Sequence, residues 1–68
     1  MIDHNGEEWG TVNEAAADVR VRPGTIYVWA SRSPIAVRSH RIGAHRFVSM
    51  VDVRHAEKAW RARLAITT

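Results

Sequence analysis

The stretch TVNEAAADVRVRPGTIYVWA, residues 11–30, predicts two short helices joined by a tight turn. Thr11 followed three residues later by Glu14 is a capping box, in which the hydroxyl caps the helix and the carboxylate reaches back to the cap amide. We therefore expect a helix over residues 12–19. Its apolar side chains have the spacing of one helix face, namely Val12, Ala15, Ala16 and Val19.

A second, shorter helix is predicted to begin at Pro23, because the first helical position has no partner for the amide hydrogen that proline lacks. Ile26 and Trp29 share one face of this helix, and residues 31–34 end it. The connection, residues 20–22, is about three residues long, and we expect Val21 to anchor it by apolar packing. Two short helices joined by so short a turn indicate a helix-turn-helix unit.

The rest of the chain predicts a β-hairpin and a third helix. Residues 35–48 have the pattern of a hairpin, with Gly43 as the residue of positive φ in its turn. Ser49 and Asp52 then repeat the capping-box spacing, which predicts a helix over residues 50–64. The apolar stripe of that helix contains Val53, Ala56, Trp60 and Leu64.

These elements predict a mainly α fold with a small β-hairpin, arranged as a winged helix-turn-helix. We expect a flexible acidic segment over residues 1–8, one domain over residues 9–65 and a short tail over residues 66–68. A chain of 68 residues has room for one core, and the absence of cysteine favours a reducing, cytoplasmic location. The side chains predicted to form the core are Val12, Ala16, Val21, Ile26, Trp29, Phe47, Val53 and Trp60.

Charge is strongly segregated along the sequence. Residues 1–18 carry a net charge of −5, residues 19–51 carry +6 with no acidic residue at all, and residues 52–68 carry +2. A central stretch of this kind attracts a polyanion, which could be nucleic acid or an anionic membrane surface. Nine of the ten basic residues are arginine, as in a high-GC genome, but codon bias does not explain a gap of 33 residues without an acid.

The second helix and the hairpin supply the candidate contact residues. On the helix, the side chains left outside the predicted core are Arg22, Gly24, Thr25, Tyr27, Val28 and Arg32. Arginine can bond guanine in the major groove, threonine and valine can contact a thymine methyl group, and tyrosine can donate to a phosphate. An alternative for Tyr27 and Val28 is that they are half-buried against the hairpin. The hairpin contributes Arg38, His40, Arg41, His45 and Arg46, with no acidic partner nearby in the sequence.

Other kinds of site are not expected. His4, His40, His45 and His55 include no i,i+4 helical pair, and no cysteine accompanies them, so we expect no metal site. The few carboxylates lie at predicted helix caps or in the acidic segment and form no recognisable triad, so we expect neither an enzyme nor a cofactor. The third helix is basic, but we expect Trp60 to be committed to the core and not to a membrane surface.

Nearly the whole chain, from Trp9 to Trp60, resembles the winged helix-turn-helix domain of the MerR superfamily, above all phage excisionases and short MerR-like regulators. The matching residues are Thr11, Glu14, Ala15 and Ala16, then Val21, Thr25, Ile26, Tyr27 and Trp29, then Gly43, Ala44, His45 and Arg46. The resemblance implies DNA contacts at Arg22, Thr25, Tyr27, His45 and Arg46. The family usually has serine where Arg22 stands and often arginine where Val28 stands, so no base preference is transferred.

We therefore expect sequence-specific binding of double-stranded DNA, by an excisionase-type recombination directionality factor or by a small transcriptional regulator. The alternative is a protein-interaction adaptor or anti-repressor that binds an acidic partner. The free protein is expected to be a monomer that associates head to tail on repeated sites, through the segment from Asp3 to Glu8 and a neighbour's Arg61 or Arg63. An integrase is a further expected partner; a membrane and a small-molecule effector are not.

Overall fold

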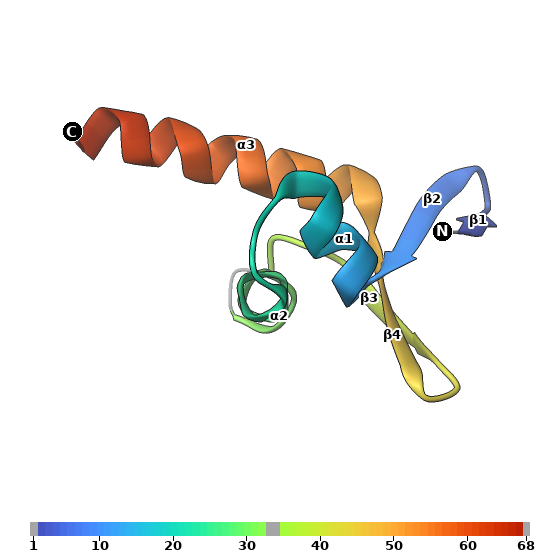
Figure 1. Ribbon diagram of the computed structural model, residues 1–68. Helices are drawn as coiled ribbons and strands as arrows, with labels where there is room; N and C mark the ends of the chain where they lie inside the picture. Colours follow the sequence, from blue (N-terminus) through green and yellow to red (C-terminus); the bar gives the residue numbers. More distant parts are fainter. Residues whose placement is uncertain (1, 33–34, 68) are drawn as a thin grey trace.

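Two β-hairpins pair side by side to form a four-stranded antiparallel sheet, which three helices complete (Figure 1). The computed structural model describes residues 2–32 and 35–67, with side chains up to Leu64. The elements in chain order are β1 (Ile2–His4), β2 (Glu7–Thr11), α1 (Val12–Val19), α2 (Pro23–Ser31), β3 (Ser39–Ile42), β4 (His45–Ser49) and α3 (Met50–Thr67). The strand order is β1-β2-β4-β3, so the two hairpins meet where β2 pairs with β4.

The start of α1 is the capping box that the sequence predicts. The backbone N–H of Glu14 donates to Thr11 Oγ1 over 3.2 Å, and the backbone N–H of Thr11 donates to Glu14 Oε1 over 2.9 Å. The bounds of α1 agree with the prediction. The helix ends at Arg20, which adopts the left-handed conformation with φ 58° and ψ 48°, and whose backbone N–H donates to the carbonyl of Ala16. That conformation turns the chain sharply toward α2.

The second helix begins at Pro23, as predicted, and ends at Ser31. Ile26 is fully buried, and Trp29 is half-buried against the core. The prediction that these two side chains face inward is therefore confirmed. Arg22 precedes the helix in an extended conformation and makes no side-chain capping bond. Residues 33 and 34, which the sequence analysis placed at the end of this helix, lie outside the described residues.

The first hairpin is an element that the sequence analysis did not predict. Residues 1–8 were expected to be a flexible segment, but Ile2–His4 and Glu7–Thr11 form paired strands, with Ile2 opposite Trp9. Asn5 and Gly6 connect them with positive φ values of 53° and 78°. This is the geometry of a two-residue turn for which Asn-Gly is the favoured sequence.

The second hairpin and α3 follow the prediction in outline. Gly43 has a φ of 63°, as expected for its place in the turn. The backbone N–H of Asp52 donates to Ser49 Oγ over 3.4 Å, which is one half of the predicted capping box. The carboxylate of Asp52 instead accepts from Arg38. The helix continues to Thr67, beyond the predicted end near residue 64, so the predicted tail is largely helical.

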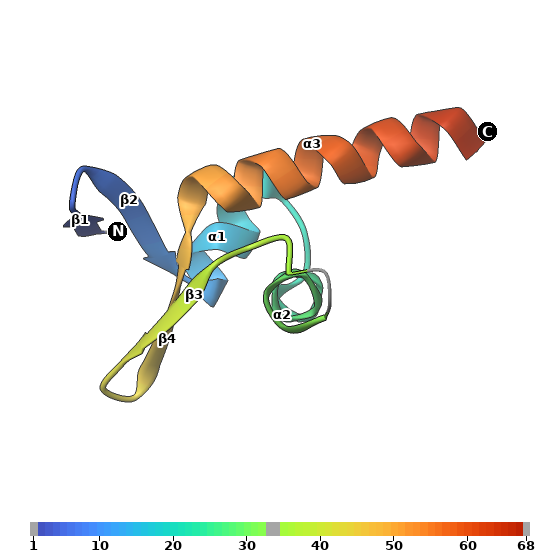
Figure 2. The same cartoon turned by 180° about the vertical axis from the view of Figure 1, so that it is seen from behind.

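The core lies where α1, α2 and the first part of α3 meet one face of the sheet. Its buried apolar members are Val12, Ala15, Ala16, Val19, Ile26, Ala30, Val37, Val48, Met50 and Val53. Val21 and Trp29 are half-buried and pack against it. Phe47 was also predicted to belong to the core, and this is wrong, because it is half-buried on the opposite face of the sheet from Val48. Trp60 was predicted to belong to the core, and this is wrong, because it is 40% exposed. The C-terminal part of α3 projects beyond the other elements, as both views show (Figures 1 and 2).

Candidate nucleic-acid interface

Five arginines within residues 2–32 and 35–67 have no carboxylate partner. They are Arg20, Arg22, Arg32, Arg41 and Arg46. The first two lie in or beside the turn between α1 and α2, the third ends α2, and the last two lie on the β3–β4 hairpin. All five belong to the central basic stretch, so part of its positive charge stays uncompensated in the folded chain.

Arg38 behaves differently from the other arginines of that stretch. Its Nε donates to Asp52 Oδ2 over 2.8 Å and its Nη2 donates to Glu7 Oε1 over 3.1 Å. The hydrogen bond to Asp52 and then the one to Glu7 raise the pKa of the Arg38 guanidinium. The guanidinium also lies over the ring of Trp9, 5.8 Å from its centroid. The expectation of a hairpin without acidic partners is therefore wrong for Arg38, which ties the two hairpins to α3.

A second group of ion pairs holds α3 to the rest of the chain. Arg54 pairs with Glu8 over 3.1 Å and with Asp18 over 3.2 Å, and the Asp18 hydrogen bond is the main cause of its raised pKa. Arg61 pairs with Glu57 one turn earlier on the same helix. Glu7 and Glu8 of β2 and Asp18 of α1 therefore pair with Arg38 and Arg54, and not with the arginines of the hairpin or of α2.

Strand alternation divides the hairpin residues between two faces of the sheet. Successive side chains of a strand point to opposite faces, so Arg46 shares a face with the buried Val48. Arg41 stands directly opposite Arg46 in the register and points the same way. His40 and His45, which stand opposite Phe47 and Ile42, belong to the other face. The two histidines are therefore separated from the two arginines with which the sequence analysis grouped them.

A cation–π contact brings the hairpin and α2 together. The guanidinium of Arg46 lies 5.8 Å from the ring centroid of Tyr27, whose side chain is otherwise 48% exposed. A contact of this type stabilises by about 0.5–1 kcal/mol at an exposed site. It joins the arginine face of the hairpin to the outer face of α2, so that these two surfaces form one continuous basic face.

The outer face of α2 is open along its length. Gly24 has no heavy atom within 4 Å of the position that a Cβ would occupy, and Thr25 next to it is half-buried. Val28 is 39% exposed, so it contributes to the surface and not to the core. Arg22 at the start of the helix and Arg32 at its end are both exposed. The helix thus presents small and apolar side chains between two arginines.

The structure brings together most of the predicted contact residues. The basic face consists of Arg22, Gly24, Thr25, Tyr27, Val28, Arg32, Arg41 and Arg46. Arg38, His40 and His45 lie apart from it. Arg20 also lies apart from it, because it lines a shallow hollow beside Arg54, Glu57 and Arg61 of α3.

Two further observations concern the described residues, and a third compares the chain with known proteins. In the part of the chain that the structure describes, no three His, Cys, Asp or Glu side chains are close enough to hold a metal ion. Within the same residues, none of the helices combines the length and apolar character needed to cross a membrane. Comparison with known proteins found no matching family model, no matching curated protein and no matching solved structure.

Proposed function

We propose that this protein is a winged helix-turn-helix module that binds double-stranded DNA without catalysing a reaction. In this proposal α2 enters the major groove and the β3–β4 hairpin is a wing that contacts the backbone or the minor groove. The observation that carries it is the basic face, where four arginines without carboxylate partners lie at the two ends of an exposed helix and on the adjoining hairpin. Such charge on a single face is the electrostatic pattern of a nucleic-acid-binding surface.

The exposed side chains of α2 support readout of bases in addition to attraction. Thr25 and Val28 offer methyl groups that fit the methyl group of thymine, and Arg22 can bond guanine. Arg41 and Arg46 are the wing residues in this proposal, and the contact with Tyr27 fixes the position of Arg46 relative to α2. The module would serve an excisionase-type recombination directionality factor or a small transcriptional regulator, in the first case beside an integrase.

Fluorescence anisotropy of a labelled duplex at several salt concentrations tests the proposal. Four arginines facing DNA release about three to four counterions, so the slope of log affinity against log salt should be about −3.5. Arg41→Ala should weaken binding to all sequences and reduce the slope by about 1. Arg22→Ala should reduce the preference among sequences more than the affinity for random duplex.

Arg61→Ala is the matched control, because Arg61 pairs with Glu57 on the far helix. It removes the same charge from the chain but leaves the basic face intact, so its slope should equal that of the wild type. A slope near zero, or an equal loss of slope in Arg61→Ala and Arg41→Ala, would contradict the proposal. Tight binding to an acidic protein with no affinity for DNA would favour the adaptor alternative instead.

A further inference from the structure

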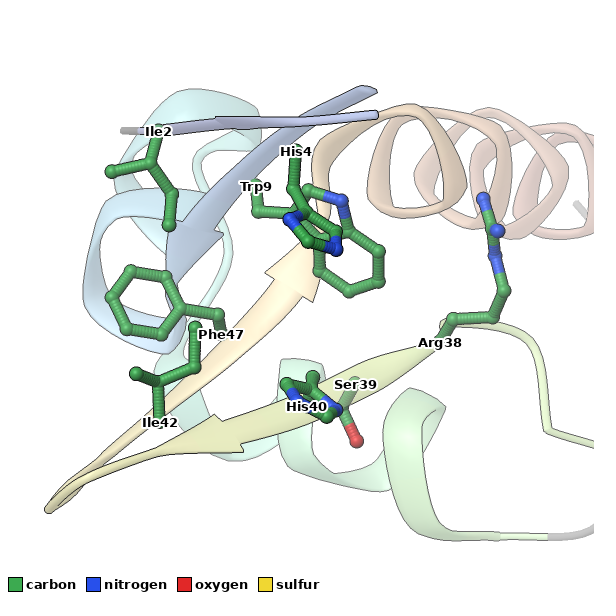
Figure 3. Close-up of a pocket in the computed structure, with 8 residues that line it drawn as sticks. All are labelled: Ile2, His4, Trp9, Arg38, Ser39, His40, Ile42 and Phe47. Carbon is green, nitrogen blue, oxygen red and sulfur yellow. The ribbon is translucent and has the colours of Figure 1, made fainter. Parts of the chain in front are cut away.

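Two arginines of the chain lie over aromatic rings at the same distance, but their other surroundings differ. The Arg38 guanidinium lies 5.8 Å from the ring centroid of Trp9, and it also pairs with two carboxylates; Figure 3 shows the Arg38 and Trp9 side chains. The Arg46 guanidinium lies 5.8 Å from the ring centroid of Tyr27, and this ring is the one partner it has among the described residues. Both arginines are therefore held in place, but only Arg46 keeps its charge uncompensated.

Arg46 needs an anchor because of the residue that faces it across the hairpin. Arg41 stands directly opposite Arg46 in the register, and within the described chain it has no carboxylate partner either. Opposite residues of an antiparallel pair have Cβ atoms about 4.5–5.5 Å apart, and like charges in these positions repel each other. Without an anchor, the guanidinium of Arg46 would turn away from Arg41 and would have no fixed place on the wing.

An aromatic ring can hold an arginine without cancelling its charge. A carboxylate in the place of the Tyr27 ring would also hold Arg46, but it would remove the positive charge that attracts a polyanion. The face of an aromatic ring attracts a cation through its quadrupole and carries no net charge. Tyr27 is well placed for this task, because it follows the fully buried Ile26 on α2 and its own side chain is 48% exposed beside the hairpin. The ring performs it without the hydroxyl group.

We propose that Tyr27 is a positioning residue of the DNA-binding surface, which acts through Arg46 and not through a contact of its own hydroxyl group with DNA. The inference rests on the proposed function, because it assigns a role within that surface. Arg46 is held in place before DNA arrives, so its side chain loses less conformational freedom on binding. A cation–π contact at an exposed site corresponds to a change in affinity of about 2–5-fold.

A double-mutant cycle, measured by fluorescence anisotropy of a labelled random-sequence duplex at low salt, tests this role. Tyr27→Leu removes the ring but keeps an apolar side chain of good helix propensity, so the affinity should fall about 2–5-fold. Tyr27→Phe is the matched control, because it keeps the ring and lacks the hydroxyl group, and its affinity should equal that of the wild type. Arg46→Ala should lose more, and adding Tyr27→Leu to it should cause no further loss.

Three results would overturn the inference. A loss of affinity in Tyr27→Phe equal to that in Tyr27→Leu would assign the effect to the hydroxyl group. A full additional loss on combining Tyr27→Leu with Arg46→Ala would show that Tyr27 acts independently of Arg46. Wild-type affinity in Tyr27→Leu would show that the ring has no role. Circular dichroism checks that each variant is folded, as expected for a side chain that is 48% exposed.

The position of Arg46 can also be measured without DNA, which separates this inference from the proposed function. In the wild type and in Tyr27→Phe, the ring current should shift the side-chain proton resonances of Arg46 upfield in the NMR spectrum. Tyr27→Leu should return them to the values of an exposed arginine. Unshifted Arg46 resonances in the wild type would overturn the inference even where DNA binds. Shifted resonances in a wild type with no affinity for any duplex would instead contradict the proposed function, and the role of Tyr27 in DNA binding with it.

Discussion

Replacing Arg20 by glycine should stabilise the protein. Arg20 ends α1 with φ 58° and ψ 48°, a conformation that costs an L-residue about 1–2 kcal/mol. Glycine adopts it without that cost but loses about 0.5–1 kcal/mol more conformational entropy on folding. The difference leaves a net stabilisation of about 0.5–1 kcal/mol. In a domain of this size that corresponds to a rise in Tm of about 2–8 °C.

Thermal unfolding followed by circular dichroism measures the effect, with Arg20→Ala as the matched control. Alanine removes the same charge but keeps a Cβ in the left-handed conformation, so its Tm should not rise. Both variants should keep nearly the DNA affinity of the wild type, because Arg20 lies beside α3 and not on the basic face. A Gly variant that melts no higher than the Ala variant would refute the argument from backbone strain. An equal loss of DNA affinity in both variants would show that the charge of Arg20 does contribute to DNA binding.

The remaining predictions concern acid stability and the core. The Thr11 backbone hydrogen bond lowers the pKa of Glu14, and the hydrogen bonds of Arg38 outweigh burial and lower the pKa of Asp52. Because the pKa values of these two carboxylates are lower in the folded state, their ionised forms stabilise the fold. This contribution is fully present above the unfolded pKa values, which are about 4, and it is lost as the pH falls through the lowered folded values. The urea midpoint of the wild type should therefore fall on acidification, and the midpoint of Asp52→Asn should depend less on pH. A variant whose midpoint changes with pH as much as that of the wild type would contradict this prediction. Ile26→Ala should cost about 2–5 kcal/mol because the side chain is fully buried, and circular dichroism should show a largely unfolded protein. Trp60→Ala should cost only about 1–2 kcal/mol, because that ring is 40% exposed and chiefly loses its edge-to-face contact with Trp29; complete unfolding would refute this.

Local signals in the sequence predict the helix starts and one turn correctly. The capping box at Thr11 and Glu14, the proline at the start of α2 and the positive φ of Gly43 each depend on residues within a few positions. The first hairpin had such a signal as well, because Asn5-Gly6 is the favoured two-residue turn. Its acidic neighbours made the segment look like a solvated tail. What the local pattern does not show is that β2 gains a second partner in β4, about 40 residues later.

Long-range contacts account for the other differences between expectation and structure. Helical spacing places Trp60 on the same stripe as Val53, but it does not show how far the facing surface extends. The partners of Arg38 are 14 and 31 residues away in sequence, so charge counting along the chain could not reveal them. The division of the hairpin between arginine and histidine faces depends on strand register. Knowing the register in advance would have placed Arg41 and Arg46 on one face and the two histidines on the other.

The segregation of charge along the sequence has a different meaning once the chain is folded. Acidic residues at the N-terminal end, with Asp52 of α3, pair with Arg38 and Arg54, and these pairs tie β2, α1, the β3–β4 hairpin and α3 together. An acid-free central stretch is then needed to keep the basic face uncompensated, because an acidic residue among Arg22, Arg41 and Arg46 would repel a polyanion at short range. The fold therefore has two groups of arginines. Arg38 and Arg54 form ion pairs between the elements, whereas Arg41 and Arg46 remain available for a ligand. Arg38→Gln and Arg41→Gln remove the same charge but should differ in consequence, the first in stability and the second in DNA affinity.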